Sequence, residues 1–339
     1  MPTFATPRRA RDVKARLAAY FVVPVLAVSG TAAAGPTHSS ARAISKLPST
    51  DCTAFPADNV WHAPITSLPV DKHSAAWVRH IGSDDLHPDF GPSFGEQPVP
   101  YGIPITYVSG SHPKVKIRFQ YSDESDHVGY PFGSDTLVEG GSQSSNDGDR
   151  HAVVVDRDNC RVYETWHTRH TAKGWTAGSG ATWSLTSDKQ RPDTWTSADA
   201  AGLSILPGLL RLDEVRAGFV DHAIRFTAET SSTHYLWPAR HEAGSVSSLS
   251  YAPMGARFRL KASFPISRYS HDTQVVLRAM KTYGMILADN GSNWYFQGEA
   301  SNAWPAKMLE ELKSIPGTSF EAVDESSLEI SPGSMAARQ

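Results

Sequence analysis

Residues 151–165, HAVVVDRDNCRVYET, decide the fold class of this chain. Two runs rich in β-branched and aromatic residues, 151–155 and 160–165, are separated by the polar turn DRDN, which is the pattern of a strand, a turn and a second strand. Outward from this stretch, residues 115–121 and 257–264 alternate apolar and polar side chains as half-buried strands do. The sequence therefore predicts a chain built mainly of short strands.

Helices are expected to be few. The strongest candidate covers residues 271–283, with Ser270 as its cap and Gly284 as its stop, and shorter ones cover 74–81 and 305–313. Many short strands, frequent Gly and Pro, and no internal repeat favour a sandwich or a barrel over a propeller or solenoid. We expect a single-domain, mainly β fold, sandwich or barrel-like, with a few peripheral helices.

The composition excludes several classes of protein. A chain of 339 residues that is 40% hydrophobic has enough apolar side chains to fold, and its formal net charge of −3 makes nucleic acid a poor partner. No phosphate-binding loop, dinucleotide glycine pattern, serine nucleophile elbow or zinc-ligand spacing is present, so we expect neither a cofactor nor a metal. No membrane span is expected either, and the protein is expected to be a monomer.

The N-terminal segment has the features of a secretory signal peptide. A basic region at residues 8–16 precedes the apolar run 17–28, and Ala32 to Ala34 supply the small residues that signal peptidase requires. A membrane anchor is the alternative, but the run is short for a span and Pro24 interrupts it. Cleavage after Ala34 predicts a secreted protein, extracellular or periplasmic, that begins with a flexible leader at residues 35–50.

The chain contains two cysteines, Cys52 and Cys160. In an oxidising compartment two such residues are expected to form an intramolecular disulfide, which would join the start of the domain to its middle. We therefore expect one continuous domain at residues 51–330, followed by a disordered tail at 331–339.

Two hairpins are expected. Residues 285–288 and 293–297 flank Asn290-Gly291, a pair that suits a tight turn. Residues 222–228 and 234–238 are joined by five turn residues, so the simplest register pairs the last residue of the first run with the first residue of the second.

The second hairpin predicts a polar cluster at its open end. Counting back along both strands gathers five ionisable residues there: Asp221, His222, Arg240, His241 and Glu242. Such a cluster offers a base that titrates near neutrality, a carboxylate to orient it, and a guanidinium for a hydroxyl-rich or anionic ligand. The alternative is a satisfied polar network that closes a sheet edge.

A second group of candidates precedes the strand at 151–155. Asp149 and His151 are expected on one face of this strand, and Glu139 lies upstream before two glycines. Two carboxylates and a histidine can serve as general acid and base. The alternative is that these residues form turns for purely conformational reasons.

Tryptophan is concentrated in a Gly-, Ser- and Thr-rich stretch. Flat indole rings beside hydrogen-bonding groups suit the apolar faces and hydroxyls of sugars. The alternative is that about half of these indoles are core residues. The candidates for substrate binding are Trp166, Trp175, Trp183, Trp195 and Trp237.

Three strings resemble a group of secreted bacterial proteins that usually carry no assigned function: GDRHAVVVD at 148–156, WTSADAAGL at 195–203 and YGMILADNG at 283–291. The resemblance covers most of the chain after Cys52. It implies a shared fold and secretion, and it transfers no activity and no catalytic residue.

These observations predict a secreted glycoside hydrolase that cleaves an extracellular polysaccharide with a carboxylate pair. Glu139 and Asp149 are the acid and base candidates. The remaining candidates surround the sugar: His151, His222, Arg240 and His241. A polysaccharide lyase is the first alternative, with a histidine or tyrosine base and Arg240 opposite a uronate. A non-catalytic carbohydrate- or envelope-binding protein is the second.

Overall fold

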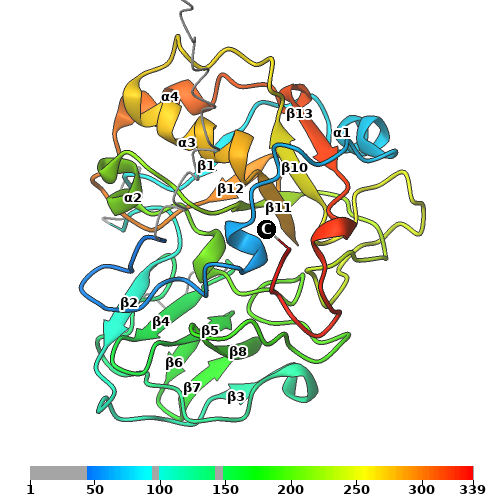
Figure 1. Cartoon of the computed structure of the whole chain (residues 1–339). Helices are drawn as coiled ribbons and strands as arrows, with labels where there is room; N and C mark the ends of the chain where they lie inside the picture. Colours follow the sequence, from blue (N-terminus) through cyan, green and yellow to red (C-terminus); the bar gives the residue numbers. More distant parts are fainter. Residues whose placement is uncertain (1–43, 94–98, 142–147, 339) are drawn as a thin grey trace, which may run out of the picture. The chain divides into compact units, whose positions relative to one another are not determined.

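The computed structural model describes residues 44–93, 99–141 and 148–338. Within them the chain is mainly β, with three sheets and a few peripheral helices, as the sequence predicts (Figure 1). The predicted signal peptide and residues 35–43 of the predicted leader lie outside the described residues.

The largest sheet has six strands in the order β1-β12-β9-β11-β10-β13. Its central strand, β9, is buried along its whole length, and it pairs in parallel with β11 and antiparallel with β12. The six strands are β1 (His87–Asp89), β9 (Ile224–Ala228), β10 (Arg257–Leu260), β11 (Met285–Asn290), β12 (Tyr295–Gln297) and β13 (Phe320–Val323).

Both predicted hairpins are wrong, because β9 uses both of its edges. Strands β11 and β12 lie on opposite sides of β9, so Asn290-Gly291 begins a crossover past the end of β9 and not a tight turn. With both edges occupied, β9 cannot pair with residues 234–238. In that segment Tyr235 forms an isolated bridge to Met254 instead.

A four-stranded sheet in the order β2-β4-β5-β8 contains the two predicted strands of residues 151–165. Strands β4 and β5 pair antiparallel through the predicted turn. A three-stranded sheet in the order β3-β7-β6 accompanies it in the lower half of Figure 1. These strands are β2 (Ile105–Val108), β3 (Arg118–Phe119), β4 (Ala152–Asp156), β5 (Arg161–Trp166), β6 (Arg169–Thr171), β7 (Gly174–Ala177) and β8 (Ser179–Ser184).

Three α-helices form close to where the sequence places them, and α2 was not predicted. Helix α1 packs against β13, and α3 packs against β10 and α4. The α-helices are α1 (Ser74–Ile81), α2 (Leu212–Ala217), α3 (His271–Thr282) and α4 (Ala306–Leu312). The short 3-10 helices are η1 (Val60–His62), η2 (Ser122–Glu124), η3 (Leu206–Gly208), η4 (Gly317–Ser319) and η5 (Ser326–Leu328). None of the helices in the described ranges is long and apolar enough to cross a membrane.

The disulfide between Cys52 and Cys160 is present, as predicted. The predicted ends of the domain need correction, because residues beyond them are packed. Leu47 is buried within the predicted leader, and Met335 and Ala337 are buried within the predicted tail. The backbone N–H of Ala337 donates to the carbonyl of Asp58 at 2.7 Å, which fastens the C-terminal segment to the start of the domain.

Candidate active site

A pocket of about 360 Å³ opens to solvent and is lined by segments of both larger sheets. Strand β5 contributes Trp166, strand β11 contributes Asp289, and the residue Asp149 lies just before strand β4. The wall is completed by two aromatic rings, four carboxyl groups and one histidine from the described residues: Tyr121, Trp166, Glu124, Asp149, Asp199, Asp289 and His241. Such a combination of rings and carboxyl groups is typical of a site for a hydroxyl-rich ligand.

A register shift in β11 precedes Asp289. Leu287 pairs with Phe226 on β9, but the next residue of β9, Thr227, pairs with Asp289, so Ala288 is an extra residue on β11. A bulge of this kind changes the direction of the side chains that follow it. The carbonyl of Ala288 accepts a hydrogen bond from the N–H of Ala201 at 2.9 Å, which fixes the loop that carries Asp199 against the same strand.

The buried guanidinium of Arg225 lies between two of the carboxylates. Its Nε and Nη2 donate to Oδ2 of Asp199 at 3.1 and 3.0 Å, and Nη2 also lies 3.5 Å from Oδ2 of Asp289. Nη1 donates to Oε1 of Gln297 at 2.9 Å, so all three nitrogens are used. One cation therefore serves two adjacent carboxyl groups.

Burial raises the pKa of both carboxyl groups. Asp199 has no exposed side-chain surface, and burial raises its pKa to about 7 although Arg225 acts in the opposite direction. Burial also raises the pKa of Asp289, with a further contribution from the charge of Asp149. About a quarter of the Asp289 side chain is exposed (24%), so this carboxyl group can reach a ligand and Asp199 cannot.

Glu139 and His151 form a hydrogen-bonded pair. Nδ1 of His151 donates to Oε2 of Glu139 at 2.7 Å, and the backbone N–H of His151 donates to the same oxygen at 3.1 Å. The imidazole is buried, and its Nε2 has no hydrogen-bond partner among the described residues. His151 interacts electrostatically with both Asp149 and Asp289. Glu139 therefore orients a histidine next to the pocket, and neither residue is part of the pocket wall.

Asp149 is exposed and is held by an aromatic neighbour. Nε1 of Trp166 donates to Oδ1 of Asp149 at 3.2 Å. The ring of Tyr121 lies 6.3 Å from that of Trp166, and both rings belong to the pocket wall. On the opposite wall Nδ1 of His241 donates to the carbonyl of Ala200 at 2.8 Å, which leaves Nε2 3.9 Å from the Glu124 carboxylate.

The structure brings together only part of the predicted site. Asp149, Trp166 and His241 line the pocket, with the Glu139–His151 pair beside it. The predicted polar cluster at the open end of the second hairpin is wrong, because this hairpin does not form. His222 is fully buried and bonds to Glu214, away from the pocket.

Arg240 also lies outside the pocket, because its guanidinium is used by Asp193 and by the carbonyls of Arg191 and Pro332. Asp221 accepts a hydrogen bond from the backbone N–H of Ser45. Neither residue is available to a ligand in the pocket.

Four of the predicted sugar-binding indoles do not line this pocket. Trp175 and Trp183 are buried and present no ring face to a substrate. Trp183 and Trp195 pack on the guanidinium of Arg191. Trp237 lines a different and larger pocket. The alternative, that these indoles are core residues, therefore holds for Trp175 and Trp183.

Three residues of the site were missed by the sequence analysis: Asp199, Arg225 and Asp289. Asp199 and Asp289 lie in two of the strings that carry the resemblance, yet no local pattern marks either as functional. Arg225 lies in a run that reads as an ordinary strand. Their proximity depends on the pairing of β9 with β11 and on the 199–201 turn, which are contacts between distant segments.

No family model matches this chain, and neither a curated protein nor a solved structure is significantly similar to it. Within the described residues, no group of three His, Cys, Asp or Glu side chains is arranged to hold a metal ion. The geometry of the pocket is therefore the basis for a functional proposal.

Proposed function

We propose that this protein is a secreted glycoside hydrolase and that the pocket between Trp166 and Asp289 is its active site. One observation carries the proposal. Asp149 and Asp289 line a single aromatic-walled pocket, and burial raises the pKa of Asp289 while Asp149 is exposed. Glycosidases need two carboxyl groups in different environments, one that keeps a proton and one that is ionised.

Asp289 is the general acid in this proposal. Its raised pKa favours the protonated form, which can protonate the glycosidic oxygen of the leaving sugar. The buried Asp199 holds Arg225 in place and acts as a positioning residue. Burial outweighs the opposing charges of Arg225 and His151 at Asp289, which supports a retained proton on this carboxyl group.

Asp149 supplies the second carboxylate. The hydrogen bond from Trp166 fixes its orientation beside the ring on which a sugar would stack. The Glu139–His151 pair interacts electrostatically with both carboxyl groups. The predicted role of Glu139 as an acid or base is replaced by this supporting role.

The charge of the pocket argues against the lyase alternative. A lyase acting on a uronate needs a cation opposite the substrate carboxylate. Carboxyl groups outnumber cations along this wall, Arg225 is already used by Asp199 and Gln297, and Arg240 lies elsewhere. A neutral polysaccharide therefore fits better than an acidic one.

Secretion is part of the same proposal. It is supported by the basic and apolar N-terminal segment and by the disulfide, which is typical of oxidising compartments. Expression with the native leader, followed by N-terminal sequencing of protein from the medium, should give a chain that starts after Ala34. Retention of the whole chain inside the cell would contradict secretion.

The activity is tested by incubating the protein that starts at residue 35 with neutral and acidic polysaccharides. New reducing ends without ultraviolet absorbance are expected from a neutral polymer, and Asp149→Asn should abolish them while the circular dichroism spectrum is unchanged. Unsaturated, absorbing products would identify a lyase. Retention on insoluble polysaccharide without product would identify a binding protein. Either result would overturn the hydrolase proposal.

A further inference from the structure

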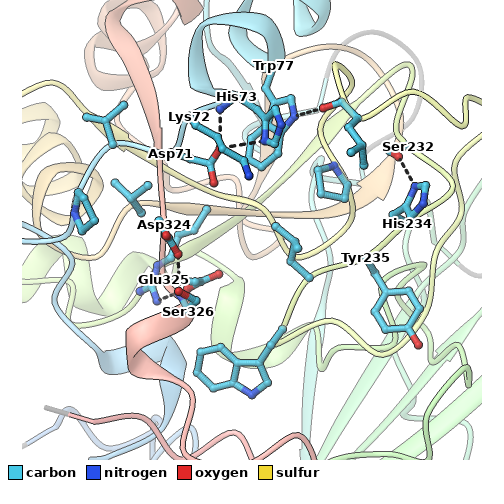
Figure 2. A pocket seen from close by; sticks show the side chains of 18 of the residues that line it. Asp71, Lys72, His73, Trp77, Ser232, His234, Tyr235, Asp324, Glu325 and Ser326 are labelled. Carbon is cyan, nitrogen blue, oxygen red and sulfur yellow. Dashed lines mark hydrogen bonds and ion pairs between the residues drawn. The ribbon is translucent and has the colours of Figure 1, made fainter.

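A second and larger pocket, of about 620 Å³, lies between α1, the segment 232–253 and the residues that follow β13. Figure 2 shows Asp324 and Glu325 on one side of this pocket and His234 and Tyr235 on the other. Its volume is in the range of pockets that bind small organic ligands. It shares no lining residue with the pocket proposed as the active site.

Glu325 is the unusual residue of this pocket. Its side chain is 6% exposed, and its Oε2 accepts from Nη1 of Arg257 at 3.2 Å. Its other oxygen, Oε1, is buried and has no partner among the described residues. A buried acceptor without a donor is costly, and a ligand with an N–H or O–H group would satisfy it.

Arg257 cannot serve a ligand, because its guanidinium is fully used inside the protein. Nε donates to the carbonyl of Tyr283 at 2.9 Å, Nη1 to the carbonyl of Val60 at 3.0 Å, and Nη2 to the carbonyl of Ala63 at 2.9 Å. Arg257 therefore partly balances Glu325 from inside the protein and is not free for a ligand. Lys72 is the other cationic side chain among the described lining residues, against four carboxyl groups: Asp71, Asp324, Glu325 and Glu329.

Aromatic rings complete the wall. Tyr235, Trp237 and Tyr251 are partly exposed and line the pocket together with the more deeply buried Trp77. Rings beside carboxylates form a favourable environment for an organic cation, through its charge and its apolar C–H groups. An anionic ligand would be repelled by the same wall.

We propose that this pocket binds an amine-bearing sugar, with the ammonium group donating to Oε1 of Glu325 and the apolar face of the sugar ring against Tyr235, Trp237 or Tyr251. The site is separate from the proposed active site and does not depend on the hydrolase activity. Glucosamine oligomers have the required chemistry, because each unit carries a cation, hydroxyl donors and an apolar ring face.

Burial raises the pKa of Glu325 to about 7, so the test is made at pH 7, where part of the carboxyl group is ionised. It is isothermal titration calorimetry of the protein that starts at residue 35 with the glucosamine dimer. The dimer should bind, and its N-acetylated form, which has the same ring but no charge, should bind at least tenfold more weakly. Glu325→Gln should weaken binding of the dimer at least tenfold. Glu321→Gln is the matched control. Glu321 of β13 accepts from Arg259 of β10, as Glu325 just after β13 accepts from Arg257 of β10, but Glu321 lies outside the pocket.

Two further variants keep the result decisive. If Glu325→Gln does not fold, Glu329→Gln at the pocket wall should still weaken binding severalfold. Asp149→Asn should leave binding unchanged, since Asp149 lies in the other pocket. Absence of binding, equal affinity for the acetylated dimer, an unchanged affinity in both glutamate variants, or loss of binding in Asp149→Asn would each overturn the proposal.

Discussion

Glu139 accepts a hydrogen bond from Nδ1 of His151 at 2.7 Å, while Nε2 of the same buried ring has no partner among the described residues. Burial alone would lower the pKa of this histidine, but the charge and the hydrogen bond of Glu139 outweigh it and raise the pKa. A protonated imidazole is thus favoured beside Asp149 and Asp289. Through His151, the predicted residue Glu139 affects the electrostatics of the two carboxyl groups of the pocket.

Replacement of Glu139 by Gln should lower the pKa of His151, because the variant removes the negative charge that offsets burial. The pKa can be followed from the ring proton signals of His151 in an NMR titration. The signals of the other histidines should titrate as in the wild type. A His151 pKa that stays constant or rises in Glu139→Gln would contradict the electrostatic role given to this pair.

Replacement of Trp166 by Ala should raise KM for the polysaccharide about tenfold, because a stacking contact of about 1.4 kcal/mol is lost. It should also lower kcat, because the hydrogen bond that orients Asp149 is removed. Trp195→Ala is the control, since Trp195 packs on Arg191 outside the pocket wall. A similar change of KM in both variants, or no change in Trp166→Ala, would remove Trp166 from the sugar-binding surface.

Replacement of Asp289 by Asn should change the pH dependence of stability. A carboxyl group with a raised pKa in the folded state contributes stability that is present at low pH and is lost as the pH rises through the raised pKa. Asparagine does not titrate, so the variant does not lose this stability. The free energy of unfolding of the variant minus that of the wild type should therefore be larger at pH 8 than at pH 4. Urea unfolding at both pH values measures the difference.

Asp123→Asn is the control for that comparison, because Asp123 is exposed. Its free energy of unfolding should follow that of the wild type at both pH values. A wild-type protein that gains stability over Asp289→Asn as the pH rises would show that Asp289 is favourably ionised, and the assignment of Asp289 as an acid would fail.

Removal of the disulfide should lower the free energy of unfolding by about 2–4 kcal/mol, because Cys52 and Cys160 close a long loop in the unfolded chain. The Cys52→Ser, Cys160→Ser double variant, unfolded with urea, gives this value. Dithiothreitol should destabilise the wild type to the same level and leave the double variant unchanged. A loss well below 1 kcal/mol would show that the bond contributes little to this fold.

Much of the fold could be predicted from the sequence because the signals are local. The 271–283 helix pattern and the strand, turn and strand pattern at 151–165 depend on neighbouring residues, and both form. The order of strands in the large sheet could not be predicted, because β9 pairs with segments about 60 residues away in the chain. The Asn290-Gly291 pair was therefore interpreted as a hairpin turn, although it follows the catalytic candidate Asp289.

The same reason limited prediction of the site. Asp149, His151 and Trp166 belong to one local strand pair, so the sequence indicated them together. Asp199 and Arg225 meet only in the folded chain, and nothing in their local patterns distinguishes them from loop and strand residues. His222 was predicted from a pairing of residues 222–228 with 234–238, and these segments do not pair.

The role of Asp289 is tested most directly by measuring how the activity of Asp289→Asn depends on the leaving group of the substrate. A general acid contributes about 10² to 10⁴ in rate, and only when the departing oxygen needs a proton. Asp289→Asn should therefore lose at least about a hundredfold in kcat on the polysaccharide. It should retain most of the wild-type rate on an aryl glycoside of the same sugar whose phenolate leaves without protonation. Equal loss on both substrates, or no loss on the polysaccharide, would contradict the assignment.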